Sequence, residues 1–152
     1  MHGQLITVFD AAQVGYRAWI FILPGIIFVI AGAIMVLTES GKFRSWFFFL
    51  FAFSWTFVVS IASYTEYHRI MHALATGNYK TVEGPVTDFT LMPVAGHSME
   101  RFRVNNVPFA YSDNAVTSGF NNTASHGGPI HEGVYVRITY IKNAIIKLEV
   151  QK

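Results

Sequence analysis

The chain contains two long apolar stretches, AWIFILPGIIFVIAGAIMVL at residues 18–37 and WFFFLFAFSWTFVVSIASY at residues 46–64. Neither stretch holds an Asp, Glu, Lys, Arg or His. As α-helices rising about 1.5 Å per residue, both are long enough to cross the roughly 30 Å hydrocarbon core of a bilayer. The short link between them, residues 38–45, makes the two helices antiparallel neighbours. The sequence therefore predicts a transmembrane helical hairpin over residues 18–64.

Composition supports a membrane protein and excludes several other classes. A chain of 152 residues that is 16% aromatic and 13% charged is too apolar for an ordinary soluble domain. Its start, MHGQLITVFD, is not basic, and the first apolar stretch exceeds a signal-peptide core, so we expect the stretch to be retained. A net charge of +2 argues against a nucleic-acid partner. The absence of Cys excludes disulfides and thiol nucleophiles, and no motif calls for a cofactor.

Small residues recur along both predicted helices. Lipid tails are as apolar as Leu, so helices pair in a membrane where small residues let their backbones come close. The predicted contact residues are Ala18, Gly25 and Gly32 in the first helix and Ala52, Thr56, Ser60 and Ser63 in the second. The alternative is that glycine is simply frequent in membrane helices.

The charges that flank the helices bear on orientation. Arg17, Arg69 and Lys80 lie on the side of the termini, and Lys42 and Arg44 lie in the link. The count favours termini, and therefore a C-terminal domain, on the cytoplasmic side. We expect residues 1–17 to form an N-terminal interfacial segment with a short helix, a frayed tail being the alternative.

After residue 64 the sequence changes character. The helical pattern continues to Gly77-Asn78, which makes residues 65–78 a helical extension and linker. From residue 79 the pattern alternates, with turns predicted at Asn105-Asn106 and Lys142-Asn143. Strands are expected at 82–91 (bent at Gly84-Pro85), 101–104, 107–111, 134–140 and 146–150. Five short antiparallel strands predict that residues 79–152 form a small all-β domain, an OB-like or SH3-like barrel.

A polar, glycine-rich connection at residues 112–132 is longer than a hairpin needs. Long connections in compact domains are often functional. The candidate binding residues gathered in and beside it are Tyr111, Asp113, Phe120, His126, Gly127, Gly128 and His131. The glycines would let a partner's backbone come close.

Several short motifs carry a resemblance. They are EG at 83–84, FRV at 102–104, FAYSD at 109–113, GGPI at 127–130, Gly133, VRITY at 136–140 and LE at 148–149. With these motifs the chain resembles a group of small bacterial inner-membrane proteins that have no assigned activity. In layout, a membrane hairpin bearing a small β-barrel, it is also similar to NfeD-type proteins. The resemblance implies a multi-pass protein of the bacterial inner membrane.

The sequence favours a membrane-anchored interaction or assembly module that binds a protein partner or itself and is not an enzyme. The first alternative is a metal site made by His97, Asp113, His126 and His131, whose nitrogen and oxygen ligands suit zinc, copper or nickel. The second is an oligomeric pore or transporter accessory subunit. A hydrolase using Ser112 or Ser125 is disfavoured because Ser112 and Asp113 are adjacent on a predicted strand and point to opposite faces.

Overall fold

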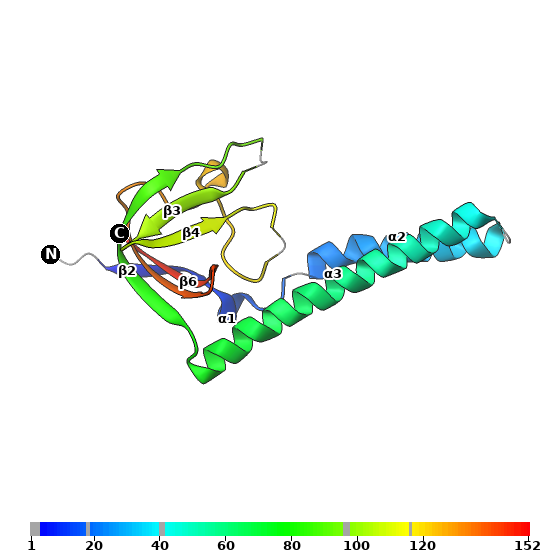
Figure 1. Cartoon of the computed structure of the whole chain (residues 1–152), viewed down its shortest axis with the longest axis horizontal. Helices are drawn as coiled ribbons and strands as arrows, with labels where there is room; N and C mark the ends of the chain where they lie inside the picture. The colour runs from blue at the N-terminus through cyan, green and yellow to red at the C-terminus, as the bar shows by residue number, and fades with distance from the viewer. Residues whose placement is uncertain (1–3, 18, 40–41, 96–97, 116) are drawn as a thin grey trace. The chain divides into compact units, whose positions relative to one another are not determined.

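The computed structural model of the chain describes residues 4–17, 19–39, 42–95, 98–115 and 117–152. These form two compact units (Figure 1). The helical unit comprises residues 16–67, and the β unit comprises residues 1–15 and 68–152.

The helical unit is built from two long helices, α2 (Trp19–Thr38) and the first part of α3 (Phe43–Thr76). They lie side by side in Figure 1, and both are long and apolar enough to cross a membrane. At the tip of the hairpin, Ser45 Oγ donates to Glu39 Oε2 at 3.0 Å, and Lys42 Nζ lies 3.5 Å from Glu39 Oε1. The predicted pair of long apolar helices is confirmed.

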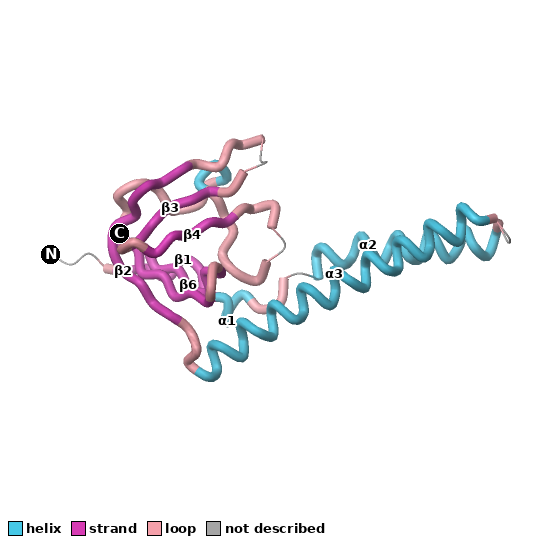
Figure 2. Tube along the Cα trace, in the orientation of Figure 1, coloured by secondary structure: helices cyan, strands magenta, loops and turns pink. Residues whose placement is uncertain are grey.

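The β unit contains one six-stranded antiparallel sheet in the order β1-β6-β5-β2-β3-β4 (Figure 2). The strands are β1 (Leu5–Asp10), β2 (Lys80–Thr90), β3 (Glu100–Val104), β4 (Val107–Tyr111), β5 (Tyr135–Ile141) and β6 (Ala144–Gln151). Two short helical turns complete the unit, α1 (Ala11–Val14) and the 3-10 turn η1 (Ala124–His126).

Strand β2 changes partner at the predicted bend. Residues 80–85 pair with β5, whereas Val86 and the residues after it pair with β3. At the bend, Asn105 Nδ2 donates to the Glu83 carbonyl at 2.6 Å, and a Cβ on Gly84 would lie only 3.1 Å from this amide group. Gly84 is therefore needed for the close approach of the Asn105 side chain.

The two predicted hairpin turns are also confirmed. Asn105 and Asn106 both have positive φ, 44° and 65°, between the paired residues Val104 and Val107. This is the conformation that asparagine tolerates and that two-residue hairpins require. Lys142 has φ 53° in the turn between β5 and β6.

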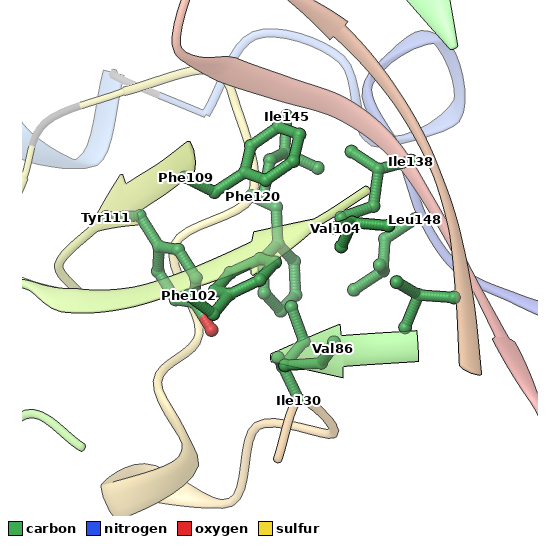
Figure 3. Close-up of a cluster of buried hydrophobic side chains, with 11 residues drawn as sticks. Val86, Phe102, Val104, Phe109, Tyr111, Phe120, Ile130, Ile138, Ile145 and Leu148 are labelled. Carbon is green, nitrogen blue, oxygen red and sulfur yellow. The ribbon is translucent and has the colours of Figure 1, made fainter. Parts of the chain in front are cut away.

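The core lies within the β unit (Figure 3). It follows the predicted alternation in β3, whose buried residues alternate with exposed ones, and in the first part of β5, where Arg137 separates buried Val136 and Ile138. The cluster consists of Val86, Phe102, Val104, Phe109, Tyr111, Phe120, Ile130, Val136, Ile138, Ile145 and Leu148.

The prediction of a closed five-stranded barrel is wrong. The sheet has six strands and is open, with β1 and β4 as its edges. Strand β1 pairs with the outer edge of β6. Because this edge of β6 is already hydrogen-bonded, β6 cannot pair with β4 to close a barrel. The connection between β4 and β5 instead brings Phe120 and Ile130 into the core, and the Phe120 amide donates to the Ile145 carbonyl of β6 at 2.8 Å.

Near the N-terminus the expected short helix is confined to α1 (Ala11–Val14), and a strand precedes it. Leu5–Asp10 is a strand whose partner, β6, is nearly the whole chain away in sequence. The short α1 that follows buries Ala11 against Ile70 of α3 and Ile146 of β6. The end of α3 therefore packs on the sheet, so residues 68–76 belong to the β unit.

Candidate functional site

The loop between β4 and β5, residues 112–134, is folded tightly onto the β unit. Tyr111, at its start, and Phe120 are each only 6% exposed, and Ile130 is fully buried. Tyr111 and Phe120 lie together in the core cluster (Figure 3). Their ring centroids are 5.3 Å apart, and the ring of Phe9 of β1 lies 5.6 Å from that of Phe120. Two of the predicted contact residues, Tyr111 and Phe120, are therefore core residues.

A buried carboxyl group organises the same region. Glu100, fully buried on β3, accepts hydrogen bonds from the Tyr111 hydroxyl and, at 2.9 Å, from the Ala124 amide of η1. Burial, together with the hydrogen bond to Glu100 and the charges of Glu100 and Asp113, raises the pKa of Tyr111 far above its usual range. The phenol is therefore held neutral. Glu100 was not among the predicted site residues, because a single Glu in an alternating strand looks like an exposed residue.

The loop also contains an Asp–His pair. Asp113 Oδ2 lies 2.5 Å from His126 Nδ1 and accepts a hydrogen bond from Thr123 Oγ1 at 2.8 Å. The His126 side chain is 45% exposed. Among the described residues, Nε2 of this ring has no hydrogen-bond partner.

Gly127 and Gly128 are required by the conformation of the loop's own backbone. Gly127, with φ 86°, ends η1 in the left-handed region. Gly128 donates its amide to the Thr123 carbonyl at 2.8 Å, and a Cβ there would lie 2.2 Å from the Asn122 carbonyl oxygen. The close approach that the sequence suggested for a partner is thus made by the chain's own backbone.

The metal hypothesis gains no support from the described residues. They contain no group of three or more His, Asp or Glu side chains placed to hold a metal ion. His131 is exposed, and its Nδ1 lies 3.1 Å from the Glu132 carbonyl oxygen. His97, the remaining member of the predicted set, lies outside the described residues.

The two candidate serine nucleophiles are engaged in hydrogen bonds. Ser112 Oγ donates to the Met92 sulfur at 3.4 Å and accepts from the Asn114 amide at 3.2 Å. Ser125 Oγ donates to the Met92 carbonyl. Both hydroxyls thus hold the loop against the segment after β2.

In the helical unit, the small residues of α2 lie against α3. A Cβ on Gly25 would lie 2.4 Å from Thr56 Oγ1, and a Cβ on Gly32 would lie 2.9 Å from the Phe49 Cα. Ala52 is buried. The remaining predicted residues behave differently: Ser60 donates to its own helix, Ser63 hydrogen-bonds to Tyr16 at 2.8 Å, and Ala18 lies outside the described residues.

A row of exposed aromatic side chains runs along α3. Phe47, Phe51 and Trp55 stack at successive four-residue steps, with ring centroids 6.4 and 6.5 Å apart. Each is about 60% exposed. This row, residues 47, 51 and 55, is called the aromatic ladder below.

A basic hollow lies on the outer face of the sheet. It has a volume of about 340 Å³ and a mixed lining. The polar members are Arg101 and Arg103 of β3 with Asp88, Thr90 and Asn143, and the apolar members are Phe102, Pro108, Phe109 and Ala110. From the sequence, the two arginines were predicted only to alternate with Phe102 and Val104 on a strand. The signal that could have found the hollow is that both arginines fall on one face of a short strand.

Comparison with protein-family models, curated proteins and solved structures found no match to this chain. The resemblance to small bacterial inner-membrane proteins therefore stays a prediction, while the layout of two long apolar helices and a β unit agrees with it.

Proposed function

We propose that the chain is a non-enzymatic interaction module of the bacterial inner membrane, anchored by its helical unit and binding a protein partner or a second copy. The observation that carries the proposal is the exposed apolar surface of α2 and α3. Ile27 is 64% exposed, Phe28 56% and Val58 61%. Leaving one such side chain in water instead of an apolar medium costs about 1.5–3 kcal/mol, so this surface calls for lipid or protein around it.

Membrane insertion and orientation can be tested together, because the chain has no native Cys. We would introduce Lys42→Cys in the helix link and, separately, Lys142→Cys in the β5–β6 turn, and treat intact cells with a membrane-impermeant maleimide. Cytoplasmic termini require labelling of Lys42→Cys in intact cells and of Lys142→Cys only after permeabilisation. The reverse pattern would invert the orientation. Release of the chain from membranes by alkaline carbonate would refute the anchor.

The aromatic ladder supports self-association through the helical unit. Aromatic pairs add about 0.5–1.5 kcal/mol beyond their buried area, and in lipid such packing is what drives helices together. Two differently tagged copies, co-expressed and isolated in native nanodiscs, should therefore co-purify. The triple change Phe47→Leu, Phe51→Leu and Trp55→Leu should reduce co-purification, whereas the triple change Ile26→Leu, Ile27→Leu and Ile30→Leu in α2 should not.

The exposed side of the loop between β4 and β5 is the proposed contact surface of the β unit. His126, Gly127 and His131 are the predicted binding residues that are exposed there. A photo-crosslinking residue at position 131 should form a discrete adduct in native membranes, whereas the same residue at exposed position 13 of α1 should not. Equal yields at both positions would refute the loop as a contact surface. Failure of both this test and the co-purification test would refute the interaction module.

A further inference from the structure

We propose that the basic hollow on the outer face of β3 is a binding site for a small phosphate-bearing ligand. Arg101 and Arg103 are exposed and alternate with buried Phe102 and Val104, so both guanidinium groups stand on the same face of the sheet. Residues two apart on a strand are separated by about 6.5 Å, which lets two long side chains converge on one anion. Arginine presents a planar fork of donors that matches phosphate oxygens.

The neighbouring strands leave room over these arginines. Arg101 pairs with Ala110 of β4 and Thr90 of β2, and Arg103 pairs with Pro108. Directly opposed residues of an antiparallel pair share a face, so the side chains flanking the arginines are small. Small flanks explain the hollow of about 340 Å³, a size suited to a small molecule.

The two arginines also have no internal partners in the part of the chain that the structure describes. Arg137 of β5 shows the usual arrangement, since its Nε lies 2.7 Å from Glu83 and its Nη1 lies 3.9 Å from Glu149. Across the described residues, neither Arg101 nor Arg103 forms an ion pair or a side-chain hydrogen bond. Their charge is therefore available to a ligand. Thr90 and Asn143, which also line the hollow, add a hydroxyl and an amide as neutral donors.

One acidic group lines the same hollow and narrows the choice of ligand. Asp88 sits in the irregular part of β2, where the register with β3 shifts between Thr87 and Thr90, and has φ 54°. Such irregularities often re-aim a side chain beside a site. A carboxylate beside two guanidinium groups complements a ligand that carries an ammonium group as well as a phosphate. Phosphoethanolamine has this chemistry, whether free in solution or as the headgroup of phosphatidylethanolamine.

The test is isothermal titration calorimetry on the full chain in dodecyl maltoside, a detergent without phosphate. Phosphoethanolamine should bind saturably and more tightly than glycerol phosphate, and ethanolamine alone should not bind. Arg101→Gln and Arg103→Gln should each weaken phosphoethanolamine binding about tenfold or more, because each removes charge-assisted hydrogen bonds. Arg69→Gln removes the same charge from an exposed position on α3 and should leave affinity unchanged. Both arginines of the hollow are exposed and have no partner among the described residues, so unchanged thermal unfolding verifies that the variants fold.

Asp88→Asn separates the two parts of the inference. It should abolish the preference for phosphoethanolamine over glycerol phosphate while phosphate binding persists. Loss of the preference without loss of binding supports the role of Asp88, and an unchanged preference refutes it. Absence of saturable binding, or wild-type affinity in both arginine variants, refutes the site.

The two sources of ligand are distinguished by repeating the titration in nanodiscs. If the headgroup fills the hollow, nanodiscs containing phosphatidylethanolamine should suppress binding of free phosphoethanolamine, and the Arg101→Gln variant should show no further loss there. Equal binding in detergent and in these nanodiscs assigns the site to a free ligand. Neither result depends on self-association, so the site and the interaction module can fail independently.

Discussion

Glu100 and Tyr111 face each other as a directly paired couple on β3 and β4, and the Tyr111 hydroxyl donates its hydrogen bond to the buried Glu100 carboxyl group. The second oxygen of Glu100 accepts from the Ala124 amide at 2.9 Å. One carboxyl group thus joins the end of the sheet to the loop that fills its open side. A buried polar group is stabilised only while its partners are in place.

Tyr111→Phe should lower the free energy of unfolding of the β unit by about 1–3 kcal/mol, because it leaves one oxygen of Glu100 buried without its donor. Near-UV circular dichroism during thermal unfolding in detergent would measure the loss. The matched control is Tyr135→Phe, which removes the hydroxyl of an exposed tyrosine bonded to Glu83 at 3.1 Å. An effect no larger than that of the control would show that the pair contributes little.

Alkaline pH should destabilise the β unit through the same tyrosine. The pKa of Tyr111 is raised in the folded state, mainly by burial, so the unfolded chain loses this proton first. The stabilisation is complete below about pH 10 and decreases above it, by up to about 1.4 kcal/mol per pH unit for one group. Unfolding midpoints from pH 8 to 11 should fall more steeply for the wild type than for Tyr111→Phe. Parallel curves would contradict this assignment.

Local patterns predicted most of the strands and both turns, since these depend on alternation and on residues that tolerate positive φ. Val136 and Ile138 face the core as expected, and Asn105 and Asn106 form the turn. What could not be predicted depends on long-range partners. Leu5–Asp10 is a strand only because β6, far away in sequence, offers an edge.

The loop between β4 and β5 likewise has features that the sequence predicted and features that depend on the fold. Its composition correctly singled out a distinctive segment, but composition cannot distinguish a residue that binds a partner from one that holds the loop together. Phe120 looks like an exposed loop aromatic in sequence and is a core residue in the fold. Asp113 and His126 look like separate ligands and are paired with each other.

Gly128→Ala should disrupt the loop between β4 and β5. The added Cβ would lie 2.2 Å from the Asn122 carbonyl oxygen and 2.8 Å from the Thr123 carbonyl oxygen, so backbone would have to move. Gly133→Ala is the control, because Gly133 has φ 80° but open space around it. That control should cost about 1–2 kcal/mol from conformation alone. Thermal unfolding should show a larger loss for Gly128→Ala, and equal losses would mean that the loop rearranges freely.

The contact between α2 and α3 predicts that a second substitution in α3 restores stability to a glycine variant of α2 only where a side-chain atom obstructs the added Cβ. Gly25→Ala places its Cβ 2.4 Å from Thr56 Oγ1, a side-chain atom, and Gly32→Ala places its Cβ 2.9 Å from the Phe49 Cα, a backbone atom. Each substitution should destabilise the hairpin by about 1–3 kcal/mol, the usual cost of overpacking. Adding Thr56→Ala removes the obstructing hydroxyl and should restore stability to Gly25→Ala.

Thr56→Ala also serves as the control for Gly32. It should not rescue Gly32→Ala, because the atom that obstructs this Cβ belongs to the α3 backbone. Unfolding of the helical signal in detergent, followed by far-UV circular dichroism for the three single and two double variants, measures the coupling. A coupling energy between Gly25 and Thr56 with none between Gly32 and Thr56 places each glycine opposite its own part of α3. Equal coupling at both positions would mean that the helices pair in another register.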